Sequence, residues 1–201
     1  MSSTSAEPGL RERKKAATRQ ALHDAAFRLA LRDGVAHVTV EAIADEAGVS
    51  RRTFSNYFAN KEEALLYGDR RRMGALIEMV CARPVDEPPW TALTRAAETF
   101  YLQLGDLDPD WLAQGRLLRS QPALITAQVQ TYAAMERDLT AAVAERLPEA
   151  DRTGVRAQLI AAAFLTAVRV AVQVWLNRPQ EAALPDLVRQ ALAEAGRGFD
   201  R

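Results

Sequence analysis

Apolar residues recur along this chain at spacings of three and four, the periodicity of helices with one buried face. No stretch of useful length alternates as a half-buried strand would. After residues 1–10, which predict a disordered arm, a first helical repeat runs to Gly34, a residue suited to a helix C-terminus. Side chains suited to N-capping then predict two short helices over residues 39–47 and 50–58 and a longer one over residues 60–82.

Breaks that contain proline divide the rest of the chain into further helices. The predicted helices cover residues 90–105, 110–119, 122–147, 152–177 and 185–195. An alanine-rich composition favours helix throughout. The chain is therefore expected to be all-α.

Composition narrows the class of protein. The 201 residues are 48% hydrophobic and 26% charged, which is typical of a soluble globular protein. The longest apolar stretch, residues 157–176, is interrupted by Gln158, Arg169 and Gln173, so no membrane span is expected. No apolar run follows the basic residues near the N-terminus, so we expect no signal peptide. The one cysteine, Cys81, indicates a packing role and a reducing, cytoplasmic location.

The formal net charge is zero, which alone would argue against a nucleic-acid partner. The charge is unevenly distributed, however: residues 1–72 carry 13 Lys and Arg against 10 Asp and Glu, and residues 73–201 carry 13 against 16. A basic run is more often a solvated face, and only the neighbouring motif turns it into a predicted DNA contact. The strongest basic cluster, here called the basic arm, consists of Arg13, Lys14, Lys15 and Arg19.

Residues 39–58 have the pattern of a helix-turn-helix, in which the second helix enters the DNA major groove by its N-terminal residues. Gly48 can take the positive φ of the turn, Val49 can pack between the helices, and Ser50 can cap the second helix. The segment therefore predicts a compact, DNA-reading pair of helices.

Helical periodicity divides the second of these helices into two faces. Phe54 and Phe58 are four residues apart and are expected to face inward. The opposite side carries Arg51, Arg52 and Ser55. Because an arginine fork pairs with O6 and N7 of guanine, this side is expected to read bases.

Other polar residues are expected to contact the DNA backbone, since hydroxyl and ammonium groups donate hydrogen bonds to phosphate oxygens. Thr39 could equally be only an N-cap, and Tyr57 only a core residue. The backbone-contact candidates are Thr39, Thr53, Tyr57 and Lys61.

Residues 15–66 follow one specific order of apolar, glycine, capping and lysine positions. These positions are Gly34, Thr39, Ile43, Ala44, Ala47, Gly48, Val49, Ser50, Thr53, Tyr57, Phe58, Asn60, Lys61 and Leu65. In this order the segment resembles the DNA-binding domain of the TetR family of transcriptional regulators. The resemblance implies that Arg51, Arg52 and Ser55 face bases. The family often has an aromatic residue where this chain has Ser55, which leaves open whether Ser55 or Asn56 reads the base.

The same resemblance implies a homodimer whose C-terminal domain senses a small molecule. Residues 152–177 support a dimer independently, because a helix that is apolar on more than one side needs a second partner. The alternative is that this is only a central helix of one subunit. Paired with residues 185–195, it would build a four-helix interface. The expected interface residues are Leu159, Val170, Gln173, Leu187 and Ala191.

Apolar and aromatic residues of the C-terminal two-thirds are candidates for an effector pocket, although a core has the same composition. They are Phe100, Leu104, Trp111, Leu118, Ile125, Phe164 and Val168. The histidines and the cysteine lack metal-ligand spacing, and nucleotide-binding and hydrolase motifs are absent from the sequence. We therefore expect no metal, no cofactor and no enzymatic activity, and the sequence does not identify the effector.

These features predict a ligand-responsive, dimeric repressor that an apolar or amphipathic small molecule releases from a near-palindromic double-stranded DNA operator. The predicted parts are the arm (1–10), a three-helix helix-turn-helix domain (11–60) and a larger helical ligand-binding and dimerisation domain (61–201). An all-α module whose helix-turn-helix contacts proteins is the alternative, but a protein-facing surface would favour aromatic and aliphatic residues over paired arginines.

Overall fold

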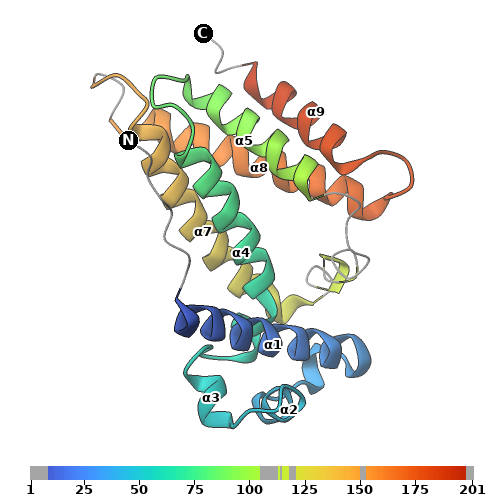
Figure 1. Ribbon diagram of the computed structural model, residues 1–201. Coiled ribbons are helices and arrows are strands. Elements are labelled where there is room, and N and C mark those ends of the chain that lie inside the picture. Colours follow the sequence, from blue (N-terminus) through green and yellow to red (C-terminus); the bar gives the residue numbers. More distant parts are fainter. Residues whose placement is uncertain (1–8, 105–112, 114, 118–120, 150–152, 198–201) are drawn as a thin grey trace. The chain divides into compact units, whose positions relative to one another are not determined.

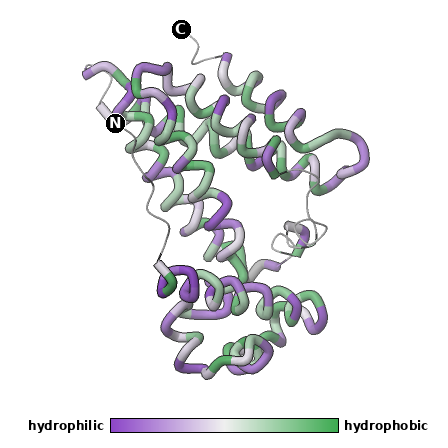
Figure 2. Tube along the Cα trace, in the orientation of Figure 1, coloured by the Kyte–Doolittle hydropathy of each residue, from purple (hydrophilic) through white to green (hydrophobic). Residues whose placement is uncertain are grey.

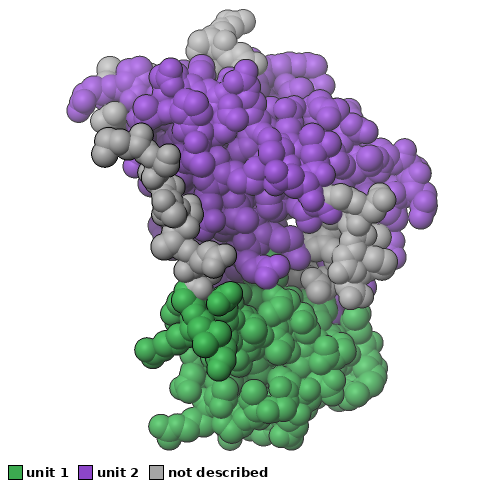
Figure 3. Space-filling model, viewed as in Figure 1, with its two compact units in different colours: residues 1–68 green, residues 69–201 purple. Residues whose placement is uncertain are grey.

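The computed structural model describes residues 9–104, 113, 115–117, 121–149 and 153–197. Within these ranges every regular element is a helix, which confirms the predicted fold class. The chain divides into two compact units, Met1–Gly68 and Asp69–Arg201 (Figure 3). This division lies inside a helix, and the functional boundary expected between residues 60 and 61 stays a prediction.

The first unit is built on α1 (Leu10–Asp33), against which the 3-10 turn η1 (Val35–His37) and α2 (Val40–Glu46) pack (Figure 1). Helix α3 (Arg51–Ser55) packs on α2, and the unit ends in the first turns of α4 (Lys61–Cys81). Three helices and the start of a fourth therefore enclose one small core.

A buried histidine joins α1 to α4 in that core. The Nδ1 atom of His23 lies 2.8 Å from the Ala64 carbonyl oxygen, the geometry of a ring N–H donating to it. The same ring meets Phe27 and Tyr67 edge-on, with centroids 5.2 and 5.7 Å apart. A polar contact thus adds direction to the apolar packing between these two helices.

Helix α1 begins at Leu10, so the basic segment that follows is helical. Arginine, lysine and alanine have high helix propensity, which favours this extension beyond the apolar repeat. The hydroxyl of Thr18 donates to the Lys14 carbonyl oxygen at 3.0 Å. Apart from its last two residues, the predicted arm over residues 1–10 lies outside the described part of the chain.

The second unit contains α5 (Pro89–Gln103), α7 (Pro122–Ala144), α8 (Val155–Asn177) and α9 (Leu184–Gly196) besides the rest of α4 (Figure 1). Three of them, α5, α7 and α9, open on a proline in the first turn, where the missing N–H costs no hydrogen bond. Most of the helix predicted over residues 110–119 falls outside the described residues.

Helix α8 forms the centre of this unit because it packs against α5, α7 and α9. Phe164 is fully buried and meets the ring of Trp90 edge-on, at 6.5 Å between centroids. Along each helix, hydrophobic residues alternate with hydrophilic ones, as expected for helices that share one core (Figure 2).

The C-terminal end of α4 is held by arginine side chains. Arg146 donates to the carbonyl oxygens of Val80 and Arg83 at 2.8 and 3.1 Å. Arg83 in turn donates two hydrogen bonds of 2.7 Å to Glu87, whose carboxylate also pairs with Arg95. The hydrogen bond from Arg83 is the largest cause of the lowered pKa of Glu87. Charge-assisted bonds of this kind satisfy carbonyl groups that a helix end leaves without partners.

Replacing Arg146 is therefore expected to destabilise the second unit. Arg146→Leu should lower the free energy of unfolding by about 2 kcal/mol, because charge-assisted hydrogen bonds to partly buried carbonyls are lost. Urea unfolding followed by tryptophan fluorescence reports on this unit, since all three tryptophans lie beyond residue 69. Arg137→Leu, at an exposed position of α7, the helix that ends just before Arg146, should change the value by less than about 0.5 kcal/mol. Equal effects of the two substitutions would contradict this role of Arg146.

Candidate nucleic-acid interface

The two short helices of the first unit are capped as the sequence predicts. The Thr39 hydroxyl oxygen accepts from the Ala42 N–H at 3.1 Å, and that of Ser50 accepts from the Thr53 N–H at 3.0 Å. Gly48 has a φ of 67°, the left-handed region that a side chain would strain. The turn between α2 and α3 is therefore fixed by local chemistry.

Helix α3 has the two faces that its periodicity predicts. Phe54 and Phe58 are 1% and 3% exposed, and their ring centroids lie 5.8 Å apart. The opposite side carries Arg51, Arg52 and Ser55, all exposed. The helix itself ends at Ser55, earlier than expected, and the exposed Asn56 follows as its C-cap. Contact of these four exposed residues, Arg51, Arg52, Ser55 and Asn56, with DNA bases stays a prediction.

An ion pair orients one of these arginines. The Arg51 Nε lies 3.0 Å from a carboxylate oxygen of Glu41, which belongs to the first turn of α2. Both side chains are exposed, so the pair contributes little to stability. Its effect is to hold the guanidinium near the start of α3. Glu41 is not among the residues that the sequence predicts for this surface: its place in the first turn of α2 is readable from the sequence, but its pairing with Arg51 is not.

The backbone-contact candidates differ in how free their polar groups are. Thr39 is exposed beyond its capping bond. The hydroxyls of Thr53 and Ser50 lie 2.8 Å apart and are hydrogen-bonded to each other. Tyr57 is half-buried. Phosphate contact by these three candidates, Thr39, Thr53 and Tyr57, stays a prediction.

Arg19 does not lie on the surface with the rest of the basic arm. Its guanidinium is half-buried over the rings of Tyr57, Phe58 and Tyr67, with its central carbon 5.9, 5.7 and 5.7 Å from their centroids. It also donates to the Tyr57 carbonyl oxygen at 3.4 Å. Arg19, predicted as part of the basic arm, thus packs against aromatic faces and joins α1 to the α3–α4 corner, and its contact with DNA stays a prediction.

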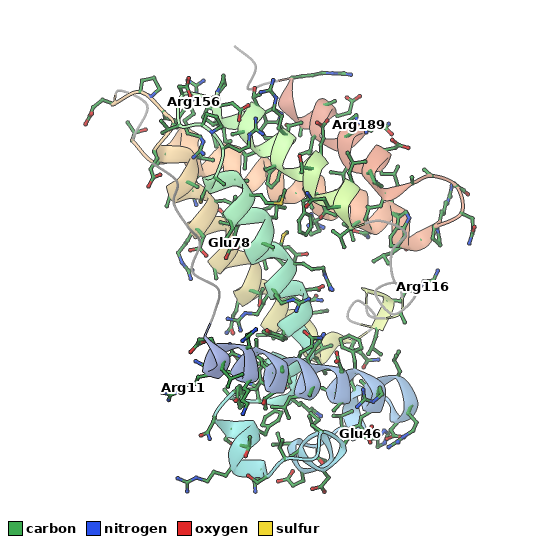
Figure 4. The ribbon with its side chains drawn as sticks, in the orientation of Figure 1. Arg11, Glu46, Glu78, Arg116, Arg156 and Arg189 are labelled. Carbon is green, nitrogen blue, oxygen red and sulfur yellow. The ribbon has the colours of Figure 1, made fainter. Side chains whose placement is uncertain are left out.

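The other three residues of the basic arm are exposed on the first turns of α1, where Arg11 also projects (Figure 4). Lys61 is half-buried instead, and its ammonium group donates to the carbonyl oxygens of Val35 and Val38 at 3.0 and 2.8 Å. At the far end of the unit, Glu46 of α2 pairs with Arg28 of α1 at 3.1 Å (Figure 4). The cations of this unit therefore form an exposed group and an internally bonded group.

The predicted pocket residues fall into three groups. Trp111 and Leu118 lie outside the described residues. Ile125 is 50% exposed on α7, and its place in an effector pocket stays a prediction. The remaining four are buried in the core of the second unit or packed against it, namely Phe100, Leu104, Phe164 and Val168.

The predicted interface residues also differ in exposure. Leu159 and Val170 are 57% and 43% exposed, and Gln173 is exposed, all on the outer side of α8. Leu187 and Ala191 of α9 are half-buried and pack against the core of their own unit. Of the helices described, only α8 is long and apolar enough to cross a membrane, but half of its apolar window is buried inside the unit, so this is weak evidence.

No group of histidine, cysteine and carboxylate side chains among the described residues could hold a metal ion. The arrangement of the first unit instead has the chemistry of a surface for an anionic polymer. It offers exposed arginines at the start of a short helix, hydroxyl groups beside them and lysines on a neighbouring helix.

Comparisons with known proteins agree with this geometry. The family model of bacterial regulatory proteins of the tetR family matches residues 22–67, and that of the MftR C-terminal domain, also a TetR-type model, matches residues 87–200. The HTH-type transcriptional regulator TcmR of Streptomyces glaucescens is 31% identical over 182 residues, which cover 88% of this chain and 80% of TcmR.

Solved structures share the fold at lower identity. SmeT in complex with triclosan, the repressor of a multidrug efflux pump of Stenotrophomonas maltophilia, has a TM-score of 0.63 and 22% identity over 90% of this chain and 91% of that chain. FadR of Thermus thermophilus in complex with lauroyl-CoA has a TM-score of 0.57 and 22% identity over 90% and 94% of the two chains. The matches to both family models and to TcmR establish that this chain belongs to the TetR family of bacterial transcriptional regulators.

Proposed function

We propose that this chain is a dimeric repressor that leaves a near-palindromic DNA operator when an apolar or amphipathic molecule binds its second unit. The observation that carries the DNA-binding part is the outer face of α3, where two exposed arginines begin a helix whose other face is buried. SmeT and FadR, which share the fold, are repressors by their descriptions, and this supports the same direction of control.

On DNA, the N-terminal end of α3 would enter the major groove. Arg51 and Arg52 are long enough to reach guanine edges there, and Ser55 or Asn56 would read a neighbouring base. Thr39, Thr53 and Tyr57 would donate to phosphates, and the lysines and Arg13 of the basic arm would add charge contacts. Two copies related by a twofold axis would read half-sites roughly 34–36 Å apart.

Single substitutions on α3 test this reading. Arg51→Ala and Arg52→Ala should each weaken binding to the intergenic duplex upstream of the gene by about 1–3 kcal/mol and weaken random DNA less, because base contacts exist only on the specific site. Fluorescence anisotropy with labelled duplexes measures both affinities, and the wild-type affinity should fall steeply as salt rises. Losses of binding free energy of equal size on both duplexes would show that the arginines contact phosphates and do not read bases. Wild-type binding that ignores salt would contradict the proposed function.

The outer side of α8 is the proposed dimer interface. Besides Leu159 and Val170, it exposes Val155 and Val174, at 63% and 45%, along one stripe at helical spacing. A largely apolar stripe on a helix that already packs on its other sides is typical of a surface that a second copy covers. Gln173 stands in the same stripe and can bond across the twofold axis.

A charge placed in this stripe should separate the subunits. Val170→Glu is expected to shift the protein from dimer to monomer at micromolar concentration in analytical ultracentrifugation, because a buried unpaired carboxylate at the interface is strongly unfavourable. Gln130→Glu, at an exposed position of α7, is the control and should remain dimeric. A wild-type protein that sediments as a monomer would contradict the proposed interface.

The core of the second unit contains a group suited to an amphipathic ligand. Tyr101 of α5 is 6% exposed, and its ring meets that of Phe100 edge-on, with centroids 5.1 Å apart. Burial raises the pKa of Tyr101, so the hydroxyl stays protonated and available as a donor. The Asp69–Arg72 ion pair and Tyr132 lie near enough to influence that pKa, which indicates a polar patch in an otherwise apolar interior. An oxygen of a bound ligand would satisfy the phenol and so offset its desolvation.

The effectors seen in the fold relatives support this ligand class. SmeT was solved with triclosan and FadR with lauroyl-CoA, both of which combine a large apolar part with a polar group. Phe164 and Val168 would contact the apolar part, together with Phe100 and Leu104, which pack against the same core. Binding would favour a dimer in which the recognition helices are spaced differently, and α4, which belongs to both units in sequence, would carry the change.

Removing one oxygen tests the polar patch. Compounds that raise the melting temperature of the wild type, from a thermal-shift screen of lipids, acyl thioesters and drugs, should bind Tyr101→Phe about tenfold more weakly, since one hydrogen bond is lost. Tyr67→Phe, in the first unit, is the matched control and should leave their affinity unchanged. Hits that bind both variants as tightly as the wild type would exclude Tyr101 from the effector site.

A further inference from the structure

Lys61 occupies a place where a cation is unexpected. It is the first residue of α4, and the N-terminus of a helix carries the positive end of the helix dipole. A lysine there is disfavoured unless something else compensates for it. The side chain is also half-buried, whereas a lysine that waits for phosphate would extend into solvent.

The compensation comes from a ring of backbone carbonyls. The ammonium group donates to the oxygens of Val35 and Val38 at 3.0 and 2.8 Å, and the oxygen of Ala36 lies at 3.5 Å. An ammonium has three N–H donors, and two of them make bonds of ordinary length to carbonyl groups of this one turn. A phosphate at this ammonium would compete with these two charge-assisted bonds.

The residues so held lead directly into α2. Val35 and Val38 are buried, and Val38 immediately precedes Thr39, the N-cap of α2. Within η1 itself the backbone bond from the Val38 N–H to the Val35 oxygen is long, at 3.4 Å. The His37 N–H also donates to the Gly34 oxygen at 3.1 Å, but among the described residues the shortest bonds to the Val35 and Val38 oxygens come from Lys61.

We propose that Lys61 is a positioning residue: its ammonium ties the first turn of α4 to η1 and thereby holds Thr39 where it contacts phosphate, and Lys61 itself does not contact DNA. The inference rests on the proposed DNA-binding function and replaces the phosphate contact that the sequence predicts for Lys61. It also makes α2 sensitive to the position of α4, because any shift of the start of α4 would pull on the turn before Thr39.

The salt dependence of DNA binding separates the two roles. Lys61→Met should raise the Kd for the upstream duplex about tenfold at fixed salt, because two charge-assisted bonds that order the turn are lost. The slope of log Kd against log salt should stay as in the wild type. Lys15→Met, on the exposed basic arm, is the comparison and should reduce that slope by about 0.9, the value for one lost phosphate contact.

Two further variants test whether Lys61 acts through its compact ammonium group and through the position of Thr39. Lys61→Arg keeps the charge but places a planar fork where a compact ammonium fits, so it should also weaken binding with an unchanged slope. Thr39→Ala should cost severalfold in affinity alone and almost nothing in the Lys61→Met background, because the residue is then no longer held in place. Wild-type affinity in Lys61→Arg, a slope reduced by about 0.9 in Lys61→Met, or additive losses with Thr39→Ala would each overturn the proposal.

A readout without DNA distinguishes failure of this inference from failure of the proposed function. In the free protein, hydrogen exchange of the Ala42 amide, which is bonded to Thr39, should be at least about tenfold faster in Lys61→Met, while amides in the middle of α1 keep their protection. Unchanged exchange at Ala42 would refute the tether even if DNA binding is confirmed. Faster exchange at Ala42 in Lys61→Met, together with no salt-dependent DNA binding by the wild type, would refute the proposed function. It would still support the positioning role of Lys61.

Discussion

Helix α3 spans only five residues, far below the length at which an isolated helix is stable in water. Its existence and direction therefore depend on the burial of Phe54 and Phe58 beneath it and on the Ser50 cap at its start. Burying each phenylalanine contributes roughly 1.5–3 kcal/mol, more than a single exposed contact on the outer face. Because the inner face holds the helix, the exposed Arg51 and Arg52 are not needed to stabilise the fold, which is compatible with the proposed role in base recognition.

The cations of the first unit show why formal charge is an incomplete guide to a DNA surface. Arg19 and Lys61 count equally with Lys14 and Lys15 in any charge sum, yet the first two are half-buried against aromatic rings and carbonyl groups. A desolvated, bonded cation acts on its neighbours before it acts on a phosphate. A charge sum over this unit therefore counts cations whose charge is already engaged inside the unit.

Most helices were predictable because their signals are local: caps at Thr39 and Ser50, a positive φ at Gly48, and the four-residue spacing of Phe54 and Phe58. The missed contacts join residues distant in sequence or in different elements, which periodicity cannot pair. The exposure of Ile125, a pocket candidate, was not predictable because apolarity does not say which helix faces are already occupied. The contacts that the sequence could not predict are Arg19 with Tyr67, Lys61 with Val35 and Val38, and Glu41 with Arg51.

Helix α4 is bonded near both ends by side chains that reach backbone carbonyls. At its start, Lys61 donates to the turn before α2, and at its end the Val80 oxygen accepts from Arg146. An α-helix does not stretch appreciably, since its length is set by a hydrogen bond at every residue. The same helix thus carries one attachment in each of the two units. The proposed switch on α4 requires only differential ligand affinity for two positions of this helix.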